Sequence, residues 1–426
     1  MSRYSQLAFK RGDPSYSGTT IHLQQYDGQV RAKLRLHEDI VLALRVNGAF
    51  GGTAADDLID MGDSGLIRRK WSFSSGMADA VATWSNADMP VSAALGIEYS
   101  YDSEDIGRPR RLDRTTHAVT QQLGDFQPLE LRNFALYAQV RAHFLEKALK
   151  LITGVRWDQH SIYNTQLNAR AGAVYRINSM LTTKLLYGSS FKAPSPFLLY
   201  AQPLQVGGII GNINLDPQRA DSIELAASFF FLQYFDFSTN VSLTRISNKA
   251  EFQPTGINQA AQNVAEINSM SIESKLNVVY NKNLRGFVSL ERQFAERSFA
   301  AFGYLSQLVG SKLAAYPDLV ARTGVTYLRP ITNDFDLQGS VLAKYVSARR
   351  SSTSNSLLAM GRYKVGEYVA LDATMMATYH MSTDIRIHIQ LIGRNLFDSY
   401  TQEPGFAGYD YPARPRELLL NVGLEL

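Results

Sequence analysis

The connections of this chain alternate in length, and this feature limits its possible folds more than any other. From about residue 37 onward, turns of two to four residues alternate with connections that are mostly 14 residues or longer. The short turns read His37-Glu38, Asn86-Ala87-Asp88, Glu146-Lys147, Asn178-Ser179, Gln233-Tyr234, Asn281-Lys282, Pro330-Ile331-Thr332 and Met381-Ser382-Thr383. Such asymmetry predicts an antiparallel meander of strands with one plain rim and one elaborate rim.

The predicted strands have one apolar face and one polar face. In the last segment Leu420, Val422 and Leu424 share a face, and Asn421, Gly423 and Glu425 share the other. The aromatic residues that lie on the apolar face one to three residues before a short turn are Tyr175, Tyr280, Tyr327 and Tyr379. Aromatic residues at one common depth are typical of the interfacial girdle of an outer-membrane barrel, whereas soluble sandwiches rarely alternate their connections in this way.

Composition excludes several other classes of protein. The chain has 426 residues, of which 45% are hydrophobic, and a mean hydropathy of -0.16. It contains no run of about 20 apolar residues that could cross a bilayer as a helix. A formal charge of +4 is too small for a nucleic-acid-binding surface. The chain has no cysteine, which rules out disulfides and thiolate metal sites.

The pattern predicts one all-β domain over residues 1–426, a transmembrane antiparallel up-and-down barrel. About 18 strands are visible, beginning with segments near 3–10 and 17–36 and ending with 414–426. The long connections are expected at 51–64, 104–129, 193–216, 249–262, 297–315, 351–365 and 400–413, with one short exception at 161–164. No linker, low-complexity tract or second domain interrupts the pattern.

Four strings in the second half resemble motifs of TonB-dependent outer-membrane receptors. Ser190-Phe191-Lys192-Ala193-Pro194-Ser195 with Leu199-Tyr200 is similar to the family string F-[RK]-A-P-[ST]…L-Y, and Gly211-Asn212-Ile213-Asn214-Leu215-Asp216-Pro217 with Ser222-Ile223-Glu224-Leu225 to G-N-x-x-L-x-P…S-x-E-L. Arg394-Asn395-Leu396-Phe397-Asp398 and Pro412-Ala413-Arg414 resemble the last two strings, and all four occur in the family order. Proline and asparagine in these strings favour a role in folding and in anchoring loops.

The resemblance implies a barrel of about 22 strands that encloses an N-terminal plug. It further implies uptake of a scarce nutrient, such as a ferric siderophore or similar chelate, in the outer membrane of a diderm bacterium. Lipid and lipopolysaccharide would surround the barrel, and the TonB complex would act only through the plug region. A signal peptide, the plug and the first few strands are expected to be missing from this chain. Gln218 and Ala413 are mild departures from the family pattern, and the closing residue Leu426 stands where family barrels usually end in Phe or Trp.

Other functions have less support in the sequence. The chain has no G-x-S-x-G, G-x-x-x-x-G-K-[ST] or H-E-x-x-H motif, so neither an enzyme nor a cofactor is predicted. Its seven histidines show no ligand spacing, and no metal site is predicted. A passive porin of about 18 strands remains the alternative, with an adhesin built as a sandwich as a third class.

Charged and aromatic residues on the elaborate rim are the candidates for ligand binding. The candidates are Arg108, Arg110, Arg111, Arg114, Tyr200, Arg349, Arg350 and Tyr409. Guanidinium groups stay charged and pair with carboxylates in bidentate fashion, and this suits an anionic chelate. The same arginines would equally suit lipopolysaccharide phosphates or simple solvation. The sequence does not choose among siderophore, cobalamin, haem, sugar or peptide.

Overall fold

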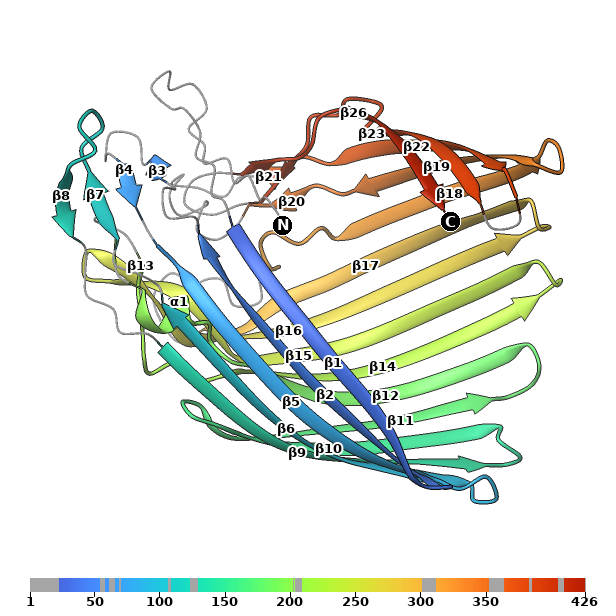
Figure 1. Cartoon of the computed structure of the whole chain (residues 1–426), viewed down its shortest axis with the longest axis horizontal. Coiled ribbons are helices and arrows are strands. Elements are labelled where there is room, and N and C mark those ends of the chain that lie inside the picture. The colour runs from blue at the N-terminus through green and yellow to red at the C-terminus, as the bar shows by residue number, and fades with distance from the viewer. Residues whose placement is uncertain are drawn as a thin grey trace.

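The computed structural model describes residues 23–53, 58–60, 66–68, 70–105, 109–122, 129–201, 203, 209–300, 312–351, 364–382, 385–404 and 410–425. Most of them belong to one curved, 18-stranded sheet, drawn in Figure 1. Every long neighbouring pair of strands is antiparallel. Among the described residues, no helix is long and apolar enough to cross a bilayer. The all-β prediction is therefore confirmed.

Seventeen long strands form a meander in which each strand pairs with the next long strand along the chain. They are β1 (Leu23–His37), β2 (Ile40–Thr53), β5 (Ser72–Ser85), β6 (Val91–Asp105), β9 (Leu129–Phe144), β10 (Leu149–His160), β11 (Asn164–Arg176), β12 (Leu181–Lys192), β14 (Gln218–Phe231), β15 (Phe235–Thr255), β16 (Asn258–Val279), β17 (Leu284–Ala300), β18 (Leu319–Pro330), β19 (Phe335–Val346), β22 (Tyr368–His380), β23 (Arg386–Arg394) and β26 (Glu417–Glu425).

Short elements decorate the elaborate rim. The two-residue strand β13 (Ile209–Ile210) pairs in parallel with β16 and completes the 18 strands of the main sheet. The one described helix, α1 (Pro196–Tyr200), lies nearby. The accessory sheets comprise β3 (Leu58–Asp60), β4 (Leu66–Arg68), β7 (Arg110–Leu112) and β8 (Val119–Gln122), then β20 (Arg349–Arg350) with β21 (Lys364–Val365), and β24 (Gln402–Glu403) with β25 (Tyr411–Pro412).

All eight predicted short turns join neighbouring antiparallel strands, which confirms the plain rim. Asparagine side chains hold several of them. The Oδ1 atom of Asn178 accepts from the N–H groups of Met180 and Leu181, each at 2.8 Å. Asn281 bonds the chain two and three residues ahead in the same way. A short side chain that bonds its own turn replaces the ladder partners that the backbone loses there.

The long connection predicted at 249–262 is wrong. Strands β15 and β16 continue through it and are joined by the two residues 256 and 257. Gly256 has a φ of 61°, which a glycine adopts without steric cost. A register irregularity near Asn248, itself at a φ of 53°, keeps the extended pair in step. The strand predicted at 3–10 lies outside the described residues.

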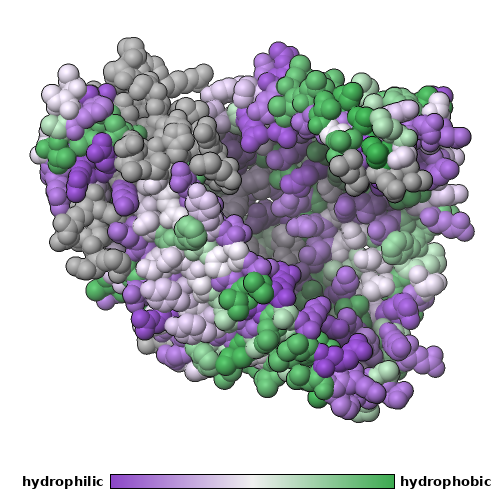
Figure 2. Space-filling view, viewed as in Figure 1, coloured by the Kyte–Doolittle hydropathy of each residue, from purple (hydrophilic) through white to green (hydrophobic). Residues whose placement is uncertain are grey.

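The two faces of the sheet separate as the alternation predicts. Leu225, Val241 and Ile272 lie side by side in register on three neighbouring strands. The four girdle tyrosines are 41%, 60%, 48% and 47% exposed for Tyr175, Tyr280, Tyr327 and Tyr379 respectively. Figure 2 shows a hollow with largely hydrophilic residues, while hydrophobic residues gather on the outside. The sheet is thus apolar on its convex face and polar on its concave face.

Candidate functional site

Two of the sequence motifs meet on the elaborate rim and form a small buried cluster, which we call the rim core. Its buried members are Tyr163, Leu199, Leu215 and Ala261, with 5%, 1%, 4% and 2% of their surface exposed. The hydroxyl of Tyr163 donates to the carbonyl of Pro194 at 2.8 Å. Burial raises the pKa of Tyr163, so its hydroxyl stays protonated and remains the donor.

Gly211 allows the chain to fold closely over α1. Its N–H donates to the carbonyl of Ala201 at 2.7 Å, and the N–H of Asn212 donates to the carbonyl of Leu198 at 2.9 Å. A Cβ atom added at Gly211 would overlap the main chain of Leu199. Only glycine therefore fits this approach of two backbones.

Asparagine side chains attach the same loop to the extended β15–β16 hairpin. The Nδ2 atom of Asn212 donates to the carbonyl of Ala261 at 2.9 Å. Asn263 accepts from the N–H of Asp216 at 2.8 Å and donates to the carbonyl of Asp216 at 3.0 Å. These contacts and the β13–β16 pairing hold the end of the hairpin, where the sequence predicts a long connection at 249–262.

The third motif forms a second attachment point, at the end of β23. Asn395 is 8% exposed and has a φ of 47°. Its N–H donates to Asp372 on β22 at 2.8 Å, and its Nδ2 atom donates to the carbonyls of Ser399 and Arg414 at 3.1 Å each. Asp398 accepts from the N–H of Arg416 at 3.0 Å just before β26. The motif therefore ties three strands together at the rim.

The remaining motif residues have smaller roles. Ala193 packs against the rim core, and Pro217 is buried. Phe191 is half-buried at the end of β12, and Leu396 donates its N–H to the carbonyl of Leu371 on β22. Glu224 lies on β14 and accepts from Asn240 at 3.4 Å. Phe397 is the exception, because 63% of its surface is exposed.

The structure separates the predicted arginine cluster. Arg110 and Arg111 lie on β7, where successive side chains point to opposite faces, and Arg114 lies in the following turn. Arg110 is exposed and stands in register with Arg68 of β4. Arg108 lies outside the described residues. The small sheet has its own buried centre in Ile67 and Leu112, so it holds these arginines on a folded support.

Asp113 fixes the turn that carries Arg114. Its Oδ1 atom accepts from the N–H groups of Thr115 and Thr116 at 2.9 and 2.8 Å, and from the Thr116 hydroxyl at 3.0 Å. Hydrogen bonds to the ionised form lower the pKa of Asp113. The turn is therefore held by a carboxylate at neutral pH.

The second predicted pair of arginines is largely engaged within the protein. Arg349 is 4% exposed, and its guanidinium donates to Glu403 at 2.6 Å and to the carbonyl of Gln402 at 3.1 Å. Arg350 is half-buried and donates to the carbonyl of Lys312 at 3.5 Å. Tyr200 is half-buried against the rim core, while Tyr409 lies outside the described residues. Arg349 thus links the β20–β21 sheet to the β24–β25 sheet.

The strands from β2 to β10 carry a chain of inward charges that the sequence reasoning missed. Arg45 pairs with Asp79 at 2.5 Å on the neighbouring strand. Arg156 pairs with Glu98 at 2.8 Å and with Asp158 at 2.9 Å. Asp158 is 1% exposed and also accepts from the amide of a neighbouring asparagine. Opposite charges at the polar positions of adjacent predicted strands could have indicated these ion pairs.

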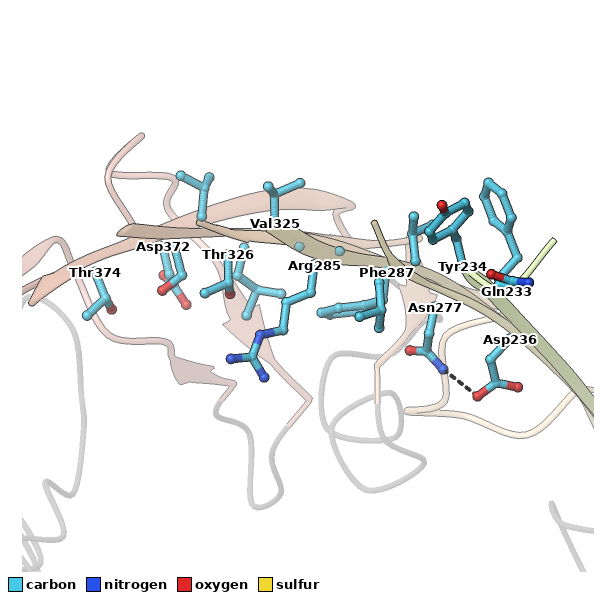
Figure 3. A pocket seen from close by; sticks show the side chains of 18 of the residues that line it. Gln233, Tyr234, Asp236, Asn277, Arg285, Phe287, Val325, Thr326, Asp372 and Thr374 are labelled. Carbon is cyan, nitrogen blue, oxygen red and sulfur yellow. Dashed lines mark hydrogen bonds between the residues drawn. The ribbon is translucent and has the colours of Figure 1, made fainter. Parts of the chain in front are cut away.

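A hollow of about 840 Å³ lies along the wall between β14 and β23 (Figure 3). Arg285 and Phe287 point to the same side of the sheet as Asp236 and Asn277. Asn277 donates to Asp236 at 3.3 Å. A wall that carries both charges and an aromatic ring can contact a ligand that has polar and apolar groups. In the part of the chain that the structure describes, no group of three acidic or histidine side chains could hold a metal ion.

A comparison with known protein families identifies the class of this barrel. Residues 3–396 match the family model described as TonB dependent receptor-like, beta-barrel. The chain belongs to this family. It is therefore a β-barrel protein of the outer membrane, as the sequence predicts, and its family is one of receptors rather than enzymes.

Relatives and solved structures agree with this membership. The vitamin B12 transporter BtuB of Vibrio cholerae is 29% identical over 163 residues, which cover 38% of this chain and 22% of the transporter. The pyoverdine-bound receptor FpvA of Pseudomonas aeruginosa has a TM-score of 0.71 at 12% identity, covering 100% of this chain and 59% of the receptor. The ferric yersiniabactin uptake receptor FyuA of Yersinia pestis has a TM-score of 0.70 at 12% identity, covering 98% and 63%. The chain thus spans less than two thirds of each of these proteins.

Proposed function

We propose that this chain is the barrel of a receptor for the energised uptake of a scarce nutrient, such as a ferric siderophore or a similar chelate. The family match over residues 3–396 carries the proposal. BtuB is named for vitamin B12 and FyuA for ferric yersiniabactin, and both ligands contain a chelated metal. The polar concave wall is consistent with the proposal, because polar and charged side chains there can contact a water-soluble chelate inside the barrel.

The small sheet that carries Arg110, Arg111 and Arg114 is the favoured capture surface. Arg110 and Arg114 are exposed on a support that the Asp113 turn and a buried centre hold in place. Arg349 is a weaker candidate, because only 4% of its surface is exposed. Capture of an anion by exposed arginines raises its concentration at the mouth of the barrel.

A plug region that contacts the TonB complex would couple transport to the energy source. No residue of the described wall has this role in our proposal. Lipid and lipopolysaccharide are the proposed surroundings of the apolar face. The barrel without a plug would enclose water, since barrels of about 16 to 18 strands already leave an aqueous channel. A passive porin would therefore share the fold but would not need an energised membrane.

Uptake in whole cells tests the proposal. Iron-limited cells that express the gene in its native context receive radiolabelled ferric chelates and cobalamin, with and without a protonophore. We expect accumulation of one ligand class that the protonophore abolishes. The triple variant R110Q/R111Q/R114Q should reduce binding of an anionic ligand several-fold, while K147Q/K282Q on the plain rim should not. Accumulation that is unchanged by the protonophore would favour the porin.

A further inference from the structure

The concave face of four neighbouring strands, β9 to β12, carries basic side chains that have no acidic partners (Figure 1). One lies on each strand: Arg141 on β9, Lys150 on β10, Arg170 on β11 and Lys184 on β12. Strand alternation and register place all four on the same side as the inward Arg156. We call these four residues the basic basin.

The carboxylates around the basic basin are already engaged. Across the described lengths of β9 to β12, Asp158 is the one carboxylate at an inward position, and Arg156 binds it at 2.9 Å. Glu98 of β6 pairs with the same arginine at 2.8 Å. On the other side of the basin, Glu224 of β14 accepts from Asn240. In the part of the chain that the structure describes, the four basin side chains therefore form no ion pair.

The basin side chains have few other partners. The guanidinium of Arg170 is exposed and donates to the uncharged side-chain oxygen of Gln139. The Nε atom of Arg141 is buried and has no hydrogen-bond partner among the described residues. Lys150 and Lys184 lie in one row across β10, β11 and β12. Like charges grouped in this way repel one another, so an anion among them would lower the electrostatic energy of the wall.

A hollow of about 290 Å³ lies beside Arg170. Its lining includes Arg170, Arg156, Asn168 and Tyr137 around Gly154. A Cβ atom added at Gly154 would lie 3.2 Å from the Nε atom of Arg170, so a larger side chain there would press on the guanidinium. Glycine therefore leaves the space beside Arg170 open. The basin thus combines positive charge that has no acidic partner with space for an anionic group.

We propose that the basic basin binds a compact anion that carries two or more separated carboxylate groups. Neighbouring strands lie about 4.8 Å apart, so the backbones of Lys150 and Lys184, two strands apart, are separated by about 10 Å. One small anionic group cannot contact both lysines, whereas a polycarboxylate can bridge them. A carboxylate in the hollow pairs with Arg170, because a guanidinium holds a carboxylate through two parallel hydrogen bonds.

As a wall contact for the transported ligand, the basic basin rests on the proposed uptake function and adds that this ligand is a polyanion. Binding of a polycarboxylate by the basin needs neither energy nor a second protein, so it is measured on the refolded chain alone. Uptake that fails while this binding is observed would contradict only the proposed function. Binding that fails while uptake is observed would contradict only the role of the basin.

Cysteine reactivity tests the basic basin, because the chain has no cysteine. Gly188 lies in register with Arg170, and a Cβ atom added at Gly188 meets nothing within 4 Å. The G188C variant therefore places a thiol in the basin without a clash. The matched control is S340C on the concave side of β19, where the neighbours in register are the uncharged Thr326 and Thr374.

Both refolded variants react in dilute buffer with an anionic, sulfonate-bearing methanethiosulfonate and with a cationic, trimethylammonium-bearing one. The ratio of the anionic to the cationic rate should be about tenfold higher at G188C than at S340C, because a positive wall concentrates anions. Propane-1,2,3-tricarboxylate should slow the reaction of G188C several-fold and leave S340C unchanged. Acetate at the same ionic strength should protect neither thiol, because one carboxylate cannot bridge the basin.

Replacing all four basin residues with glutamine should remove both the rate ratio and the protection at G188C. The double variant R170Q/K184Q, which changes only the two exposed residues, should weaken both and serves if the fourfold variant does not refold. The control K275Q/R285Q removes two exposed inward charges from β16 and β17 and should change neither. Tricarboxylate that does not protect G188C, or that protects equally after the basin is neutralised, would overturn the proposal. Equal protection by acetate would also overturn it, because it would indicate only a general positive field.

Discussion

The hydroxyl of Tyr163 donates a hydrogen bond of 2.8 Å to the carbonyl of Pro194, and this bond joins the connection after β10 to the motif that follows β12. The donor is 5% exposed, so little water can replace the bond. The Tyr163→Phe variant should lose about 1–3 kcal/mol, because it leaves a buried acceptor unpaired. Urea unfolding of the refolded barrel measures this loss.

The matched control for Tyr163→Phe is Tyr175→Phe. Tyr175 is 41% exposed on the apolar face, and its hydroxyl makes no hydrogen bond to any described residue. We expect its variant to unfold at the wild-type urea concentration. Equal losses in the two variants would show that the bond to Pro194 does not stabilise the rim core.

The facing of the strands predicts a strong asymmetry between neighbouring positions. Val241→Arg should cost roughly 2–4 kcal/mol if the site lies near the bilayer midplane. Asn240→Arg should cost far less, because Asn240 points to the concave side and already bonds Glu224. Ile387→Arg and His388→Arg form a second pair on β23. Refolding titrations in lipid vesicles measure the differences, and equal costs within each pair would contradict the assigned faces.

The inward ion pairs predict a stability loss that depends on burial. Asp158→Ala leaves Arg156 with Glu98 alone, and we expect a loss of about 3 kcal/mol, the lower end for breaking a buried pair. The double variant with Arg156→Leu also removes the partner of Glu98, so it should lose more stability than Asp158→Ala alone. Glu130→Ala removes the partner of the exposed Arg132 and should cost far less, because solvent screens an exposed ion pair. A double-mutant cycle from urea unfolding gives these values.

The turn that carries Arg114 should open in acid. Hydrogen bonds from Thr115 and Thr116 lower the pKa of Asp113, so the folded turn binds protons less readily than the unfolded chain. The stabilisation is therefore fully present above the unfolded pKa of about 3.9, and it is lost as the pH falls through the lower folded value. Amide exchange at Thr115 and Thr116 should accelerate in that range. In the Asp113→Asn variant, the exchange rates of these amides, corrected for their intrinsic pH dependence, should stay constant over the same pH range.

The short turns were predictable because their chemistry is local. Asn178 and Asn281 bond backbone groups two and three residues ahead, so the signal and its effect lie in one stretch of sequence. The alternation of faces is local as well, since a strand turns each successive side chain to the opposite side. The family strings were also readable in order, although their contacts were not.

The missed features depend on partners that are distant in the chain. Residues 249–262 look like a loop by themselves, but Asn263 and Ala261 receive Asp216 and Asn212 from a connection almost 50 positions earlier. Arg349 looked like a free rim charge until Glu403 was placed beside it. No local pattern records such pairs.

The sequence by itself determined the class of fold, because a period of two and an alternation of connection lengths act within single hairpins. Only the tertiary structure decided which charges meet on the concave wall and which rim arginines remain exposed. It also decided that the first and last strands of the described meander, β1 and β26, both run toward the plain rim. The physical reason is that these properties depend on pairing between segments far apart in the chain. Their free energies come from burial and from charge partners that exist only once the sheet has formed.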